Sequence, residues 1–526
     1  ANNTFSICYL LATTERKLMC NGRFFTMDRV LEIYLMQLST PFKTPAWLIV
    51  TLLIIGGCSS NNSPSEPEDL DNNDDSIEVP TRTQFLYTQT NDARGNHVVG
   101  FSVNDNGDLV EIGVYETGSV GDADEGDFDS QSSVRVYEDF LIVANPGDAS
   151  GESGITDGNS AITIFAINED GSLQRVDQNL EVDGTQNADS RGVRAVSIDF
   201  HSEGETTWVA VANQGTNRVC VNPEVNGSLA TCSDQFGNAL GDLLADESPA
   251  SDIQLFRLSE SGVLTHEAEI AGFAANRGGP SQVAFSPDGT KISATLLGIP
   301  HLSFPADPAN QQPSRTYLWE FDKAVGTASN ERFFEHPGIA GSIGFGWSPS
   351  SDFLYVSSAT LDAGALEANV VALDSNDTDS VFTSDGNSRW SGAGAVPTAV
   401  RPAACWVWIN EAADRVYTVG FLTNTVSTFE TNGADMTHLQ TVYRQDITLE
   451  DAKDLVFSAD GKNAYVLGAF FSHTISTFDV NTDGTLAERT TSPLAISASR
   501  LNGVPLDPSL IAYQGLDGYP AAYVGY

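Results

Sequence analysis

DLVFSADGKNAYVLGAFFSHTISTFDVNTDGTLAERT, residues 454–490, contains four short apolar stretches separated by turn residues. Within TISTFDVN (474–481) large and small or polar residues alternate, which is typical of a half-buried β-strand. Two of the separators, SADGK and NTDGT, carry a glycine that can adopt the positive φ of a tight hairpin turn. The segment therefore predicts four consecutive antiparallel strands.

The alternating stretch recurs along the chain. Its seven copies are HVVGFSVN (97–104), AITIFAIN (161–168), DIQLFRLS (252–259), TYLWEFDK (316–323), NVVALDSN (369–376), TVSTFETN (425–432) and TISTFDVN (474–481). Upstream of most copies lies a second pair of apolar strands joined by a turn, as in SQVAFSPDGTKISATLLG (281–298) and CWVWINEAADRVYTVGF (405–421). Repetition of such a four-stranded unit around an axis makes a β-propeller.

These repeats predict an all-β fold, a seven-bladed β-propeller of four-stranded antiparallel blades. The first unit begins at FLYTQT (85–90) and lacks its innermost strand. We expect the C-terminal segment VPLDPSLIAYQG (504–515) to supply that strand, which would complete blade 1 and close the ring.

The N-terminal region has the features of a lipoprotein signal peptide. From Met36 the chain passes Lys43, continues as the apolar run AWLIVTLLII (46–55) and reaches Gly56-Gly57-Cys58. The run is too short to span the roughly 30 Å hydrocarbon core of a bilayer as a helix. We therefore predict cleavage before Cys58 and lipidation of its thiol; the alternative is a short signal anchor.

The prediction divides the chain into four parts. Residues 1–35 would be an upstream extension outside the mature protein, 36–57 the signal peptide, 58–80 an acidic disordered tether, and 81–526 the propeller. Ser59 after the lipidated cysteine resembles outer-membrane sorting. The expected location is thus the outer membrane of a bacterial envelope, facing the periplasm or the surface.

The charge of the chain excludes some partners. The net charge is −44, although residues 1–57 carry more bases than acids, so the acidic excess lies in the remainder. Such a surface repels nucleic-acid backbones and anionic lipid headgroups. We expect no nucleic-acid partner, membrane contact only through the lipid anchor, and a monomer.

Two cysteines of the exported part are placed for a disulfide. Cys220 and Cys232 flank VNPEVNGSLAT, in which Asn226-Gly227 is a turn signal, so a cross-strand disulfide is natural in an oxidising compartment. Two free thiols are the alternative. No spacing of Cys and His resembles a zinc site, and the sequence predicts no metal ligands.

Several of these stretches resemble one known family. YTQTNDARGNHVVGFSVNDNGDL, SRGVRAVSIDF, GGPSQVAFSPDGTK and RPAACWVWINEAADRVYTVGF look like segments of the lactonase-type seven-bladed propellers with YVTN-type repeats, a family that includes 6-phosphogluconolactonases and 3-carboxymuconate cyclases. The likeness covers residues 83–515 and implies a lactone-opening or lactone-forming hydrolase. This chain has Gly279-Pro280-Ser281-Gln282 where phosphogluconolactonases carry a Pro-His segment, which argues against a sugar-phosphate lactone.

Long loops on one face carry most of the candidate functional residues. Six cations are expected there, around the central channel: Arg191, Arg194, Arg277, Arg401, Lys453 and Arg500. Guanidinium forks suit carboxylates, so these residues predict a small anionic ligand, with Arg194 and Arg277 in catalytic roles and the other four in binding. The alternative is that they pair with acids such as Asp189, Asp446 and Asp454 and fill the channel.

Lactone hydrolysis also needs a base that activates water. The candidates are His336 and Glu335, between blades 4 and 5, with His301 on a long loop as a binding residue. A lone loop histidine is commonly a solvated surface residue, which is the alternative for His336. No Gly-x-Ser-x-Gly motif is present, which disfavours a serine hydrolase.

No cofactor is required by this interpretation, although calcium could bind one loop. Asp122, Asp124, Asp127 and Asp129 in GDADEGDFDS resemble a calcium loop but depart from the EF-hand order, and a solvated acidic loop is the alternative. The sequence thus favours a lactonase-like propeller that acts on a carboxylated lactone at the channel mouth. The second hypothesis is a non-catalytic propeller that binds a ligand or a protein.

Overall fold

The computed structural model describes residues 84–122, 130–147, 160–178, 187–215, 220, 229–234, 239–300, 312–336, 339–357, 370–377, 404–445, 451–496 and 511–520, and three short N-terminal strands. The chain divides into two compact units, Ala1–Arg82 and Thr83–Tyr526. In the first, β1 (Cys8–Leu11), β2 (Lys17–Cys20) and β3 (Arg23–Thr26) form an antiparallel sheet. The predicted signal peptide, Cys58 and the tether lie outside the described residues.

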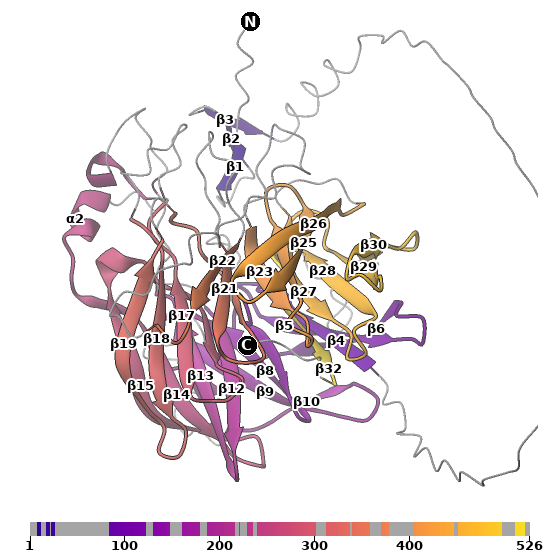
Figure 1. The fold of residues 1–526 in the computed structure, drawn as a ribbon, viewed down its shortest axis with the longest axis horizontal. Helices are drawn as coiled ribbons and strands as arrows, with labels where there is room; N and C mark the ends of the chain where they lie inside the picture. The colour runs from indigo at the N-terminus through magenta and orange to yellow at the C-terminus, as the bar shows by residue number, and fades with distance from the viewer. Residues whose placement is uncertain are drawn as a thin grey trace, which may run out of the picture. The chain divides into compact units, whose positions relative to one another are not determined.

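The second unit is a seven-bladed β-propeller, which confirms the fold predicted from the repeats (Figure 1). The strands of each blade are given from the innermost outwards: blade 1 has β32 (Gln514–Tyr519), β4 (Gln84–Gln89), β5 (His97–Val103) and β6 (Leu109–Glu116), and blade 2 has β7 (Val134–Tyr137), β8 (Phe140–Asn145), β9 (Ala161–Ile167) and β10 (Leu173–Arg175), with β11 (Ala188–Asp189) also paired to β9. Blade 3 has β12 (Ala195–Glu203), β13 (Thr206–Asn213), β14 (Pro249–Leu258) and β15 (Leu264–Ala274); blade 4 has β16 (Pro280–Phe285), β17 (Lys291–Leu296), β18 (Arg315–Asp322) and β19 (Thr327–Glu335); and blade 5 has β20 (Phe345–Trp347), β21 (Phe353–Ser357) and β22 (Val370–Asp374). Blade 6 has β23 (Ala404–Ile409), β24 (Arg415–Gly420), β25 (Thr425–Asn432) and β26 (Asp435–Tyr443), and blade 7 has β27 (Ala452–Phe457), β28 (Asn463–Gly468), β29 (Thr474–Val480) and β30 (Leu486–Glu488), with β31 (Leu494–Ala495) also paired to β29.

The ring is closed by a C-terminal strand, but this strand begins later than expected. The innermost strand of blade 1 is β32, which pairs antiparallel with β4 from Gln514 opposite Gln89 to Tyr519 opposite Phe85. The expected segment was 504–515. Glycine and aspartate are poor strand formers, so QGLDGY does not look like a strand; it becomes one because Asp517 is buried against blade 2 and accepts the N–H of Val136.

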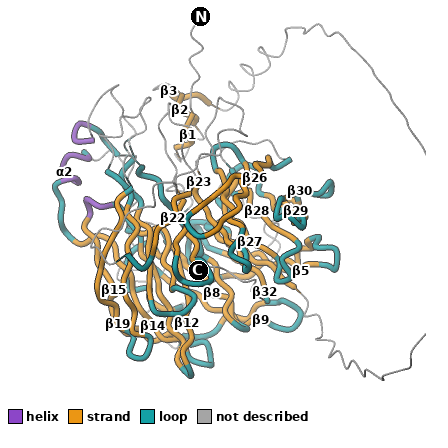
Figure 2. Tube along the Cα trace, in the orientation of Figure 1, coloured by secondary structure: helices purple, strands orange, loops and turns teal. Residues whose placement is uncertain are grey.

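The hydrophobic core lies between the blades. Both faces of each sheet are covered by neighbouring blades, so strands such as β16, β23 and β28 are buried along their whole length. One apolar cluster joins Phe101 of blade 1, Trp408 of blade 6 and Tyr465 of blade 7, and another joins Leu318 of blade 4 to Trp347 of blade 5. Figure 2 shows that the described part is almost entirely strand and loop.

Tyrosines of the second strands join consecutive blades. Each hydroxyl donates a hydrogen bond to the carbonyl oxygen of the turn glycine between the third and fourth strands of the next blade. The pairs are Tyr87 with Gly171 (2.9 Å), Tyr355 with Gly433 (2.7 Å), Tyr417 with Gly484 (2.9 Å) and Tyr465 with Gly107 (3.1 Å). The last pair joins blade 7 to blade 1, so these bonds also stabilise the closed ring.

Polar side chains of the innermost strands join the blades near the axis. Each accepts a backbone N–H of the next blade: Asp454 from Leu516 (3.1 Å), Asp517 from Val136 (2.8 Å), Asp199 from Phe285 (2.7 Å) and Gln282 from Phe345 (2.6 Å). Arg135 of blade 2 also lies within 3.1 Å of an Asp199 oxygen and 3.4 Å of an Asp517 oxygen. Buried hydrogen bonds of this kind fix how neighbouring blades meet.

The connection from β6 to β7 crosses the axis of the propeller. Just before β7, Gln131 hydrogen bonds to both the N–H and the carbonyl of Val407 in blade 6, and the Trp406 indole donates to the Ser130 carbonyl. The Gln131 N–H bonds Ser281 of blade 4. Blades 2 and 6 lie across the ring, so Ser130 and Gln131 occupy the channel at this level.

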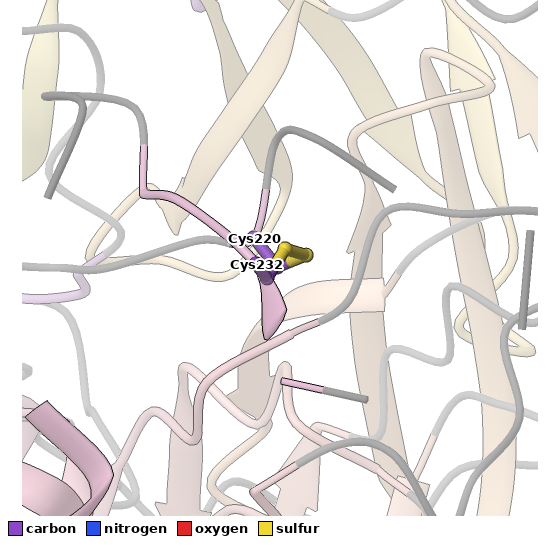
Figure 3. Close-up of a disulfide and its surroundings, with 2 residues drawn as sticks. All are labelled: Cys220 and Cys232. Carbon is purple, nitrogen blue, oxygen red and sulfur yellow. A yellow bond between two sulfur atoms is a disulfide. The ribbon is translucent and has the colours of Figure 1, made fainter. Parts of the chain in front are cut away.

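A disulfide holds the insertion between β13 and β14. Cys220 and Cys232 are bonded, with their Cα atoms 5.7 Å apart (Figure 3), which confirms the predicted pair. Both sulfurs pack with Leu240 of α2 (Leu240–Leu244) and with Ile299. Among the described residues no helix has the length and apolar character needed to cross a membrane.

Candidate functional site

A buried charged cluster lies where the β6–β7 connection meets the long-loop face. Asp122 accepts hydrogen bonds from Arg194 Nε at 2.5 Å and from Asn91 Nδ2 at 2.9 Å. Arg194 Nη1 donates to Gln214 Oε1 at 3.3 Å. Asp122 is fully buried and Arg194 is 3% exposed, so their attraction is little screened by water. Blades 1 and 3 thus meet at one carboxylate.

Lys453 joins this cluster from blade 7. Its side chain is buried, and burial lowers its pKa well below the usual value, although the carboxylates of Asp122 and Asp454 act in the opposite direction. The ammonium nitrogen lies 5.6 Å from the centre of the Trp406 ring and 4.9 Å from that of Phe470, within cation–π range. Burial thus favours the neutral amine of Lys453 over the ammonium form.

The backbone at this cluster is strained. Arg194, Asn91 and Asp454 adopt positive φ angles of 64°, 51° and 32°. Residues with a Cβ seldom occupy this region, and their cost is commonly retained at functional sites. Three such residues at one cluster favour a functional role for it.

Arg277 lies next to this cluster, and Arg191 points elsewhere. Gly279, two residues after Arg277, packs so closely that a Cβ there would overlap the Gln214 carbonyl oxygen, so this segment contacts the residue that holds Arg194. Among the described residues Arg277 has no ion-pair partner. Arg191 is half-exposed and lies 3.5 Å from Asp189. Pairing with a neighbouring acid was the alternative to ligand binding expected for these arginines.

The two residues predicted as the base lie at the outer strands of blade 4. Glu335 ends β19 and forms an ion pair at 2.9 Å with Arg315. His336 is fully buried, shares a hydrogen bond of 2.8 Å with Thr316 and packs edge-on against Phe334. His336 is therefore not the solvated surface histidine of the alternative. None of these contacts is with Arg194, Lys453 or Arg277.

Other predicted site residues lie outside the described part of the chain. They are Arg401, Arg500 and His301, together with Asp124, Asp127 and Asp129 of the proposed calcium loop. Asp122, the first acid of that loop, forms an ion pair with Arg194. Within the described residues no group of three or more His, Cys, Asp and Glu side chains could hold a metal ion.

A hollow lined by described residues lies on the opposite face. It has a volume of about 520 Å³ and lies between the short turns of blades 6 and 7, over Trp408, Tyr417 and Phe457. Its acids Asp460 and Asp483 are hydrogen bonded within their own turns. We therefore base the candidate site on the buried cluster rather than on this hollow.

Comparison with known proteins gives the fold but no close relative. A periplasmic gluconolactonase of Pseudomonas aeruginosa superposes with a TM-score of 0.51 at 13% identity, covering 82% of this chain and 99% of that one. This chain has the propeller fold of that gluconolactonase. A protein from Lactobacillus plantarum gives a TM-score of 0.53 at 10% identity, covering 83% and 99%. No family model and no curated protein matches the sequence.

At 13% identity, the likeness to the gluconolactonase shows the fold alone and assigns no functional residue in this chain. Arg194 and Lys453 were predicted from the sequence, whereas the pairing of Asp122 with Arg194 was not, nor were Asn91 and Gln214. The only available signal was that Asp122 starts an acidic loop between two blades. Its partner is 72 residues away, so only the closed ring brings the two together.

Proposed function

We propose that this protein is a lactonase-like enzyme that opens or forms a carboxylated lactone at the mouth of the propeller. The observation that carries the proposal is the buried pair of Arg194, from blade 3, and Asp122, with Lys453 of blade 7 near enough for its charge to interact with that carboxylate. Arg194 keeps one edge of its guanidinium for a ligand oxygen, and the Lys453 amine is a second polar group near the same carboxylate. The gluconolactonase fold supports the class of reaction.

The chemistry of ring opening assigns a role to each cation. Water adds to the lactone carbonyl carbon, the ring C–O bond breaks, and the ring oxygen takes up a proton. Lys453, in its neutral form, would accept the proton from water and return it to the leaving oxygen. Arg194 Nη2 has no hydrogen-bond partner among the described residues, so it can donate to the oxygen that gains negative charge.

Arg277 would hold the ligand carboxylate beside this centre, because its charge is not neutralised by any described residue. Glu335 and His336 remain candidates for the base only if the substrate extends to blade 4. Neither a metal nor another cofactor has a role in this scheme, and a calcium ion in the acidic loop would be structural.

The location proposed for the enzyme is the bacterial envelope. A lipid on Cys58 would anchor a monomeric propeller to the outer membrane through the acidic tether. The Cys220–Cys232 disulfide supports this location, since such bonds persist in oxidising compartments.

The proposal is tested by assaying a panel of γ- and δ-lactones, with and without a carboxylate, against three variants. Arg194→Lys should lower kcat/KM by about 100-fold, the usual effect of removing one donor to an oxyanion, and Arg277→Ala should lower it through a higher KM, because the contact with the ligand carboxylate is lost. Arg194→Lys keeps the charge beside Asp122, so the fold should persist. Arg191→Ala is the matched control and should turn over normally. Wild-type rates in both Arg194→Lys and Arg277→Ala would reject the site.

A non-catalytic ligand-binding propeller is the second candidate. The observation in its favour is the burial of the cluster, because Lys453 has no exposed surface. A lactone panel without turnover, combined with saturable binding of a small carboxylate that Arg277→Ala weakens, would support this candidate over the enzyme.

A further inference from the structure

Three aromatic rings form a continuous wall beside the charged cluster. The rings of Trp406 and Phe421 lie 6.5 Å apart, and those of Phe421 and Phe470 lie 5.9 Å apart, in both cases edge to face. Trp406 is buried, whereas Phe421 and Phe470 are partly exposed. The next residue, Phe471, is 37% exposed and is one of the few large apolar side chains on the surface of the described residues.

The loop that carries Phe470 and Phe471 is held rigidly. The Oδ1 atom of Asp451 accepts the N–H groups of both phenylalanines at 2.8 Å, and its Oδ2 accepts the hydroxyl of Ser472. Arg444, fully buried like Asp451, lies 3.3 Å from the same carboxylate. An exposed aromatic side chain on a fixed backbone loses little conformational entropy when a ligand covers it.

The aromatic wall lies next to the charged cluster, because Lys453 lies over the rings of both Trp406 and Phe470. An anion bound by Lys453 and Arg194 would therefore have the rings of blades 6 and 7 as its neighbours. The phenyl rings offer a ligand no hydrogen-bond donor or acceptor. They suit a flat apolar group and not a chain of hydroxyl groups.

We infer that the ligand of the mouth carries its carboxylate next to an aromatic or similarly flat apolar group, which stacks on Phe470 and Phe471. This inference rests on the mouth being the ligand site proposed above. It deepens that proposal by excluding polyhydroxylated sugar acids and their lactones as the preferred substrates.

Isothermal titration of the full chain with phenylacetate, acetate and gluconate tests the inference. Phenylacetate should bind about tenfold more tightly than acetate or gluconate, as expected for one well-placed aromatic contact. Phe471→Ala should remove most of this difference and leave the affinity for acetate unchanged. Because Phe471 is exposed, the variant should keep the wild-type Tm. Phe470→Ala should act in the same direction.

Leu439→Ala is the matched control, since Leu439 is equally exposed at 39% but lies on β26, the outermost strand of blade 6. It should leave all three affinities unchanged. Equal binding of phenylacetate and gluconate, or a preference that survives both phenylalanine substitutions, would overturn the inference. Binding of aryl acids without lactone turnover would support this inference and contradict the proposed lactonase activity. Turnover of glucono-δ-lactone without a preference for aryl acids would support the lactonase activity and contradict this inference.

Discussion

Gln131 makes two hydrogen bonds to the backbone of Val407 across the ring, donating to the carbonyl at 2.7 Å and accepting from the N–H at 3.0 Å. The amide thereby acts as an additional strand partner for β23. Asp122, at the other described end of this connection, belongs to the charged cluster.

Gln131→Ala should lower the free energy of unfolding by about 2–4 kcal/mol, because it leaves a buried N–H and a buried carbonyl without partners. Denaturant unfolding followed by tryptophan fluorescence measures this change, since Trp406 bonds the same segment. Gln174→Ala, at an exposed strand position of blade 2, should have almost no effect. Equal stability of the two variants would show that the crossing segment does not hold the ring.

The free energy of unfolding should fall as the pH rises from about 4 to about 7. Burial raises the pKa of Asp454 to about 7 and that of Asp199 to about 6, and it also raises that of Asp517. The unfolded chain ionises these groups near pH 4, so between about pH 4 and pH 7 the folded state binds more protons. The free energy of unfolding therefore decreases with pH across this window and becomes constant for these groups above it.

Asp454→Asn tests this assignment, because an amide cannot ionise. The difference in Tm between pH 5.5 and pH 8 should shrink in this variant. At pH 5.5 the variant should be less stable than the wild type, since Nδ2 cannot accept the Leu516 N–H. Asp435→Asn, an exposed change of the same charge, is the control and should keep the wild-type slope. An unchanged slope in Asp454→Asn would refute the assignment.

The parts of this fold that depend on local patterns were predictable, and those that depend on ring closure were not. All seven copies of the alternating stretch became the third strands of blades, because two-residue periodicity is a local property. The closing strand β32 begins ten residues later and ends four residues later than the segment expected from the sequence, because Asp517 is buried through its bond to blade 2. Likewise, the local sequence does not distinguish Gln131 from other loop glutamines, because its partner Val407 lies in blade 6.

For the site, sequence reasoning found the cations but not their arrangement. Arg194 and Lys453 were chosen for their charge and loop position; Arg194 is hydrogen bonded to Asp122, and the charge of Lys453 interacts with the same carboxylate. His336 and Arg191 were chosen for the same reasons, yet their contacts are with Thr316 and Asp189. Residue type and loop position could not separate these cases, since neither determines where a side chain points.

Removal of the disulfide should loosen the insertion and not the propeller. A crosslink closing a loop of this size stabilises by about 3 kcal/mol in the chain-entropy model, and Cys220 also donates its N–H to the Pro300 carbonyl of blade 4. Cys232→Ser should therefore speed amide hydrogen exchange across residues 239–250. Exchange should also rise at Asn276, whose N–H bonds Asp246 of the insertion beside Arg277. Cys405→Ser should leave this region unchanged, and equal protection in both variants would contradict the prediction.

Asp122→Ala should convert the internal ion pair into a binding site for a small external carboxylate. The change leaves the buried Arg194 without its carboxylate and removes a negative charge that acts on Lys453, and breaking a buried pair costs about 3–5 kcal/mol. Formate can occupy the vacated space and should raise the Tm of the variant in proportion to the logarithm of its concentration above Kd. Sodium chloride at equal ionic strength should do so less, because chloride lacks the two separate oxygens with which a carboxylate accepts from Arg194 and Asn91. The same formate titration should shift the wild-type Tm much less, since Asp122 already fills the position. If formate and chloride stabilise Asp122→Ala equally, Asp122 is not the internal anion that the two cations share, and a second carboxylate has no reason to bind there.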